Sequence, residues 1–205
     1  MNHFEFVFMD HFGNACNAAL LSVVGMLVAY PVIKWDIKGL QVVPMWLFKA
    51  VLNLLGAHPG LLRTTLVIFC FNSMAIFLYM ASGVHPLIPG LIAILTACNI
   101  AVIVSKATEV ESPKVSEGLF TARWYPGSSL TYVCGLMVIL LELPCFWYSI
   151  AMGMSLGSEV IMHQSTYAQG LAIRGQAYIV LIVPLLLVSA ACESIAIRGM
   201  APRNE

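Results

Sequence analysis

Five long apolar segments limit what this chain can fold into. A bilayer core about 30 Å thick is crossed by about 20 apolar residues in a helix. Only 10% of the residues are charged, against about 25% in a typical soluble domain, and the mean hydropathy is +0.89. The sequence therefore predicts an all-α polytopic transmembrane bundle that forms a single domain over residues 1–205. The expected spans are Ala15–Ile33, Thr64–Val84, Leu87–Ser105, Ser128–Gly153 and Ala177–Ile197.

Three shorter stretches connect these spans. Val42–Leu55 is apolar but too short to cross, and it contains Lys49 and Asn53, so we expect an interfacial helix along the membrane. The turn "SGVHPLIPG" has two prolines and a glycine, which predicts a tight hairpin between the second and third spans. The polar stretch 154–176 has a weak helical pattern and is expected at a surface.

The distribution of lysine and arginine predicts an orientation. Ten such residues are present, and all except Arg174 fall in the first loop, the third loop or the C-terminal tail. Cytoplasmic loops carry an excess of Lys and Arg. We therefore expect a multi-pass protein of the cell inner (plasma) membrane with its N-terminus outside and its C-terminus in the cytoplasm.

Several functional classes are disfavoured by composition and motifs. The formal net charge of zero provides no basic surface for nucleic acid. The chain has no nucleophile elbow, H-E-x-x-H or P-loop motif, so we expect no enzyme activity and no cofactor. The six cysteines form no C-x-x-C pair and are interpreted as small buried apolar residues.

We also expect no metal site. His3, Glu5, Asp10 and His11 gather near the N-terminus, but without a recognised ligand spacing. Glu159 and His163 stand four residues apart, which would place both on one helix face. A third ligand is not close to them in the sequence, and a solvated surface is the simpler interpretation.

Polar residues inside the expected spans are the candidate sites. Such groups are costly in lipid and usually face the bundle interior. Counted from flanking basic residues with a 1.5 Å rise per residue, Asn72, Asn99 and Glu193 lie at comparable depths in the cytoplasmic half. This predicts one polar layer, either of structural hydrogen bonds between helices or of groups along a pathway or docking site.

Glu142 lies nearer the membrane midplane, two residues before Pro144. The proline cannot donate a backbone hydrogen bond, which frees the carbonyl of Leu140 and favours a kink. We expect the carboxyl of Glu142 to point inward against other helices. A kinked helix beside a midplane carboxyl is typical of transporter sites, and it also fits a purely structural bend.

Four segments together resemble the stage II sporulation protein M family of small polytopic membrane proteins. Asn72 and Asn99 lie on either side of a glycine-bearing turn, as in that family, and "LLELPCFWYSIAMGMSLG" resembles its Glu-Leu-Pro segment. The last span resembles the family's final span, with Pro184 followed by Glu193. The resemblance covers roughly 64–200. The chain departs from the family where "GLMVILLELP" lacks a histidine and where Ile100 follows Asn99 in place of glycine.

The resemblance implies a membrane scaffold. The family's namesake helps to anchor peptidoglycan hydrolases during engulfment in sporulating bacteria, and relatives occur in organisms that never sporulate. We therefore expect a non-catalytic integral membrane scaffold or accessory subunit whose partners are the lipid bilayer and other membrane protein subunits. The alternatives are a permease-like transporter component with a midplane carboxyl site, and an accessory subunit of a respiratory or photosynthetic complex.

Overall fold

The computed structural model describes residues 3–56, 60–109 and 129–200. This part of the chain is helical throughout, apart from short turns, and contains no strand. The elements are α1 (His3–Lys34), α2 (Lys38–Leu55), α3 (Leu61–Ala81), α4 (Leu87–Glu109), α5 (Ser129–Ile161), α6 (Tyr167–Ala177), the π-helical turn η1 (Tyr178–Ile182) and α7 (Val183–Met200).

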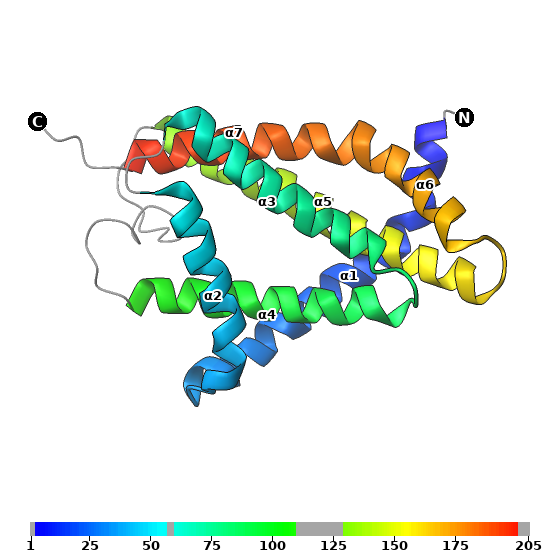
Figure 1. Cartoon of the computed structure of the whole chain (residues 1–205), viewed down its shortest axis with the longest axis horizontal. Helices are drawn as coiled ribbons and strands as arrows, with labels where there is room; N and C mark the ends of the chain where they lie inside the picture. Colours follow the sequence, from blue (N-terminus) through cyan, green and yellow to red (C-terminus); the bar gives the residue numbers. More distant parts are fainter. Residues whose placement is uncertain (1–2, 57–59, 110–128, 201–205) are drawn as a thin grey trace, which may run out of the picture.

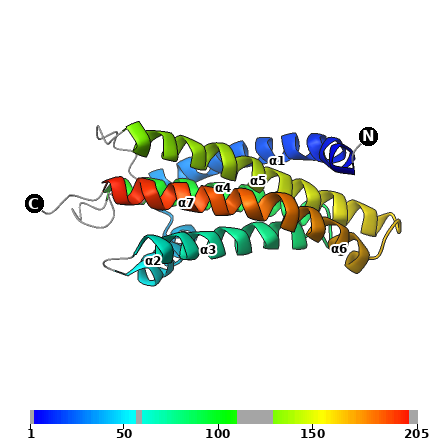
Figure 2. The same ribbon diagram turned by 90° about the horizontal axis from the view of Figure 1, so that it is seen from above.

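Five helices are long and apolar enough to cross a membrane. Figures 1 and 2 show them running along the length of the molecule, with the start of α1 and the end of α7 at opposite ends. The predicted all-α polytopic bundle is therefore confirmed, and the chain is a multi-pass membrane protein. The qualifying segments are His11–Lys34, Leu61–Ala81, Leu87–Lys106, Val133–Ile161 and Tyr167–Ile197.

The helix α2 lies across one end of the bundle, where it contacts α3 and α4 (Figure 1). It is not among the five helices that qualify as spans, as the short apolar run with Lys49 and Asn53 predicted. A tight turn joins it to α1: Asp36 adopts φ 47, its N–H bonds to Ile33, and the N–H of Ile37 bonds to Val32. This Schellman pattern ends α1 and redirects the chain at once.

The stretch 154–176, which was expected at a surface, is exposed at its turn, where Ile161 and Met162 are about half exposed, but it is helical over most of its length. Most of this stretch continues the two flanking spans, and Leu156 is fully buried. The helix α5 ends in a second Schellman pattern with His163 at φ 55, and Thr166 starts α6 with a capping box to Gln169. These local signals confine the turn to a few residues, which weak hydrophobic periodicity did not reveal.

The last span contains a π-helical turn. Its helix passes from α6 through η1 into α7, and the N–H of Val183 bonds to the carbonyl of Tyr178, five residues back. Pro184 follows directly. A proline ring in a regular helix clashes with the carbonyl four residues before it. The wider turn accommodates that ring and lets the span continue without a break.

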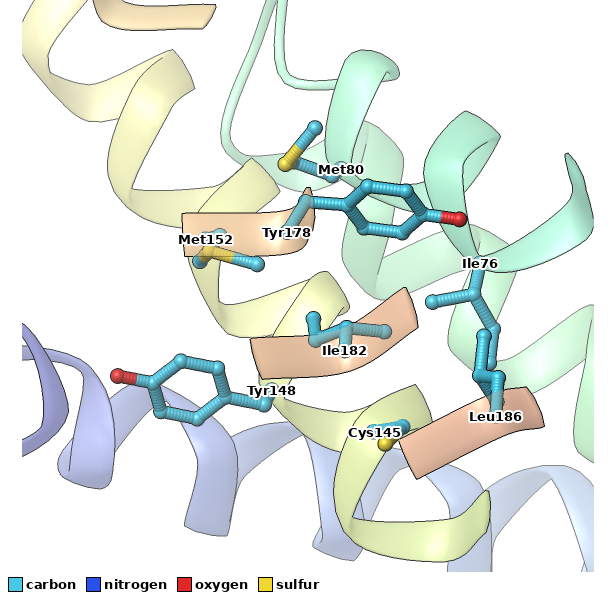
Figure 3. Packing of buried hydrophobic residues seen from close by; sticks show 8 residues of the cluster. All are labelled: Ile76, Met80, Cys145, Tyr148, Met152, Tyr178, Ile182 and Leu186. Atoms are coloured by element: carbon cyan, nitrogen blue, oxygen red, sulfur yellow. The ribbon is translucent and has the colours of Figure 1, made fainter. Parts of the chain in front are cut away.

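The main core lies between α3, α5 and the last span (Figure 3). Met80, Met152, Ile182 and Leu186 are almost completely buried there. In Figure 3 the ring of Tyr148 points away from this cluster toward α1. Two smaller clusters join α1 to α4 and α5. The helix α5 therefore lies at the centre of the bundle, and it contacts α1, α3, α4, α6 and α7.

The hairpin between α3 and α4 is present as predicted and packs directly on α5. A Cβ atom on Gly153 would lie 2.6 Å from the carbonyl oxygen of Tyr79, and one on Gly157 would lie 2.4 Å from the backbone nitrogen of Pro86. A side chain at either position would collide with backbone. The two glycines stand one turn apart and allow the hairpin to approach the α5 backbone closely.

Candidate functional site

The carboxyl of Glu142 joins three helices in the membrane. Its Oε1 atom accepts hydrogen bonds from Asn72 Nδ2 of α3 at 2.8 Å and from Ser189 Oγ of α7 at 3.0 Å. Glu142 itself belongs to α5. We call these three residues the Glu142 junction. The expectation that this carboxyl faces other helices is confirmed.

The helices bring the three side chains together from distant parts of the sequence. Asn72 lies near the middle of α3, and Ser189 lies within α7. Glu193 follows Ser189 by one turn on α7, which packs against α5. Two acidic side chains are therefore placed along the contact between α5 and α7.

Of the predicted layer of Asn72, Asn99 and Glu193, the structure shows Asn72 bonded to Glu142, and Glu193 lies one turn beyond Ser189, the other partner of Glu142. The partner of Asn72 is Glu142, and Asn99 belongs to α4, which packs mainly against α1. The helices α3 and α4 are joined by a tight hairpin but share few contacts along their length. A comparison of depths along the sequence does not indicate which helices are neighbours.

Pro144 lies inside α5, which continues through it to Ile161. Its side chain is exposed on the outer face, whereas the next residue, Cys145, is buried in the core. The proline is therefore beside the Glu142 junction in sequence, but it is not one of its hydrogen-bonding residues.

Two further polar contacts tie the last span to α3. Thr65 Oγ1 donates to Ser194 Oγ at 3.0 Å, and the hydroxyl of Tyr178 donates to the carbonyl of Ser73 at 2.6 Å. Together with the Glu142 junction, these contacts form a series along the interface between α3 and the last span. The sequence alone had not connected any of these residues.

A buried arginine lies near the opposite end of this interface. The side chain of Arg174 is 6% exposed and forms a bidentate ion pair with Glu159, in which Nη1 lies 3.2 Å from Oε2. Its guanidinium also donates to Ser155 Oγ at 3.0 Å and to the carbonyl of Gly170 at 3.1 Å. Ser165 Oγ donates to Glu159 Oε2 at 3.3 Å. We call these five residues the Arg174 cluster.

The Arg174 cluster corrects our interpretation of Glu159 and His163. His163 follows the end of α5 with a left-handed backbone, so it does not share a helix face with Glu159. Glu159 pairs with the buried Arg174, and its own side chain is 31% exposed. Gly170 makes this possible, because a Cβ atom there would lie 3.3 Å from Arg174 Nη1 and 2.5 Å from Leu156.

The sequence held a signal for this pair that we did not use. Arg174 is the one basic residue outside the loops assigned to the cytoplasm, and Glu159 is the acidic residue nearest to it in the preceding segment. An isolated charge of each sign next to apolar helices often indicates an ion pair. Ser189 carried no comparable signal, because serine is common in transmembrane helices.

An open groove of about 330 Å³ lies on the outer side of α3 beside η1. Its lining includes Phe69, Phe77 and Tyr178, and the rings of the last two are in edge-to-face contact with centroids 5.5 Å apart. Glu142 does not line it. Asn72 and Ser189 are not among its lining residues either.

Within residues 3–56, 60–109 and 129–200, no group of three His, Cys, Asp or Glu side chains is arranged to hold a metal ion. The side chains of His3, Glu5 and Asp10 lie outside the described part. The chain matches no family model, no curated protein and no solved structure.

Proposed function

We propose that the protein is a non-catalytic integral membrane scaffold or accessory subunit that holds partner proteins in a larger membrane complex. The observation that carries this proposal is that an intramembrane carboxyl, that of Glu142, forms hydrogen bonds to other helices of the bundle. Its Oε1 atom accepts bonds from Asn72 and Ser189, so the intramembrane carboxyl links α5 to α3 and α7. Interhelical hydrogen bonds of this kind hold helices together in a bilayer.

The outward faces of α1 and α4 support a docking role. Leu20, Leu27, Leu91 and Leu95 are each at least 59% exposed and stand at helical spacings on their two helices. In a membrane these faces contact lipid or the helices of another protein. The resemblance to the stage II sporulation protein M family agrees with a role in holding other proteins.

We further propose that the protein lies in the plasma membrane with its N-terminus outside. Lys34, Arg63 and Lys106 lie at one end of the bundle, whereas Arg174 at the other end is buried and paired. Single cysteines placed at Asn2 and Asn204 of a cysteine-free variant should then react with an impermeant maleimide from opposite sides. Labelling of both from one side would contradict this topology.

The test of the scaffold proposal is copurification from native membranes, followed by mass spectrometry. The parent should recover the same membrane proteins in repeated preparations. Glu142→Gln keeps a side-chain oxygen that can accept both bonds, so it should recover them as well. Glu142→Leu removes the acceptor and should lose them. A parent chain that recovers no protein above the level of an unrelated membrane protein would contradict the proposal.

One observation favours a second candidate, a permease-like transporter component. Glu142 and Glu193 are both intramembrane carboxyls on adjoining helices, an arrangement that also suits a pathway for a cation. Under this alternative Glu142→Gln should fold and assemble normally but abolish substrate movement in proteoliposomes. Unchanged assembly and unchanged cation flux in that variant would exclude it.

A further inference from the structure

The helix α2 runs across the direction of the spans at one end of the bundle (Figure 1). Its inner face is marked by three buried residues, Gln41, Pro44 and Leu55. Gln41 Nε2 also donates to the carbonyl of Val32, near the end of α1, at 3.1 Å. These contacts fix the rotation of α2 about its own axis, and they determine which of its residues face away from the bundle.

The outer face of α2 has a lysine edge and an apolar edge. Lys38 and Lys49 are both exposed and stand eleven residues apart, which is three helical turns, so they lie on one line along the helix. The other edge repeats this spacing with apolar side chains. It is formed by three residues that are each more than half exposed, Leu40, Val43 and Leu54.

An exposed tryptophan lies between the two edges. Trp46 stands two residues after the buried Pro44, so it is on the opposite side of the helix, and it is 66% exposed. Val42 and Asn53 lie beside it on the same outer face and are also exposed. Tryptophan rings favour the level of the lipid headgroups. A helix that lies along a membrane surface turns one side toward the headgroups and the other toward the acyl chains.

The charge of α2 is entirely positive. Lys38 and Lys49 are its charged residues, and it has no acidic one. Asp36, in the turn before α2, pairs with Lys106 of α4 at 3.5 Å. In the described part of the chain neither Lys38 nor Lys49 forms an ion pair. The lysine edge therefore presents two cations whose charge the protein itself does not compensate.

We propose that α2 binds anionic phospholipids, with the ammonium groups of Lys38 and Lys49 on headgroup phosphates and the apolar edge against the acyl chains. The two lysines stand about 16 Å apart along the helix, so each contacts a different lipid. Basic residues on an amphipathic helix favour anionic lipids, because a zwitterionic headgroup carries a positive charge of its own. The inference holds whether or not the protein is a scaffold, and for either orientation in the membrane.

The test measures which lipid lies beside Trp46. The full chain is reconstituted in phosphatidylcholine vesicles that contain a minor fraction of brominated phosphatidylglycerol or, in parallel, of brominated phosphatidylcholine. Bromine quenches the fluorescence of a tryptophan that it contacts. The signal of Trp46 is the difference between each protein and the same protein with Trp46→Phe. In the parent, brominated phosphatidylglycerol should quench Trp46 more strongly than brominated phosphatidylcholine, and high salt should reduce the difference.

Substitution of the lysines should remove this preference in steps. Lys49 stands one turn from Trp46, so Lys49→Gln should lower the preference for phosphatidylglycerol by up to about fivefold, which is the contribution of one lysine near an anionic surface. The double variant, Lys38→Gln with Lys49→Gln, should show none. Lys49→Arg keeps the charge and should keep the preference. A size-exclusion profile like that of the parent establishes that each variant is folded.

Lys34→Gln is the matched control. Lys34 is exposed at the same end of the bundle but belongs to α1, and its Nζ lies 5.4 Å from the centre of the Tyr30 ring. Its substitution should leave the preference at Trp46 nearly unchanged, and a loss as large as that in Lys49→Gln would overturn the proposal. Equal quenching by the two lipids in the parent, or a preference that survives in the double variant, would overturn it as well. Absence of quenching by either lipid would mean that protein covers this face, and it would have the same result.

Discussion

Two regions of this bundle are held together in different ways. The region of α3, α5 and the last span is crossed by side-chain hydrogen bonds and one buried ion pair, from Thr65–Ser194 through the Glu142 junction to the Arg174 cluster. The α1–α4 pair is packed by small and apolar residues, and a Cβ atom on Gly25 would lie 2.2 Å from the carbonyl oxygen of Ile94.

The difference shows two ways in which helices can be held together in lipid. Helices in lipid gain little from burying apolar surface against each other, because the tails are as apolar as leucine. Close backbone approach at small residues gains van der Waals contact, and polar pairs gain hydrogen bonds whose alternative is an unsatisfied group in hydrocarbon. Substitutions that separate the two mechanisms should therefore affect the two regions differently.

The largest loss in the free energy of unfolding is expected from substitutions in the Arg174 cluster. Glu159→Leu leaves a guanidinium that is 6% exposed without its counter-ion, and removing one partner of a buried pair costs about 3–5 kcal/mol. The measurement is the free energy of unfolding in mixed micelles. Arg174→Leu is the control and should cost less, because the Glu159 carboxylate is 31% exposed and can reach solvent. Equal losses in the two variants would contradict this description.

The second effect is expected at the Glu142 junction. Glu142→Leu leaves the donors of Asn72 and Ser189 without their acceptor, and each unsatisfied buried donor costs about 1–3 kcal/mol. Glu142→Gln retains an oxygen acceptor and should lose much less. Thermal unfolding of the two variants in the same detergent decides the question. If Leu is tolerated as well as Gln, the junction does not stabilise the bundle.

The third effect is expected in the α1–α4 pair. Gly25→Ala places a methyl group against the α4 backbone, and overpacking of this kind costs about 1–3 kcal/mol. Gly13→Ala on the same helix is the control, because no atom lies within 4 Å of its Cβ position. It should be neutral or stabilising, since alanine favours helix over glycine. A stabilising Gly25→Ala would show that α1 and α4 are not in close contact.

The smallest effect is expected at the end of the polar series. Thr65→Ala removes the hydrogen bond to Ser194, and such bonds in membrane proteins average about 0.6 kcal/mol. Ser194 Oγ still donates to the carbonyl of Ala190, so it is not left unsatisfied. Unfolding free energies of Thr65→Ala and of the conservative Thr65→Ser measure the difference. A loss above about 2 kcal/mol would mean that Thr65 does more than form this bond.

The spans could be predicted from the sequence because each one is a long apolar run, and the helix bounds differ mainly at the ends. The inward carboxyl of Glu142 was also predictable, since its exposure to lipid is costly. That Asn72 and Ser189 are its partners could not be predicted. Which helices are neighbours depends on packing, such as the contact of Gly153 and Gly157 with the α3–α4 hairpin, and single-sequence periodicity does not record it. For the same reason Ser189 was missed, whereas the pairing of Arg174 with Glu159 could have been inferred from their isolated opposite charges.

The most direct test of this account is a double-mutant cycle on Asn72 and Glu142, measured as the free energy of unfolding of the parent, Asn72→Leu, Glu142→Leu and the double variant. Because the two side chains bond directly at 2.8 Å across α3 and α5, the account predicts that their effects are not additive, with a coupling of about 0.6–2 kcal/mol. Strictly additive effects would contradict it, because Glu142 would then not tie these helices together.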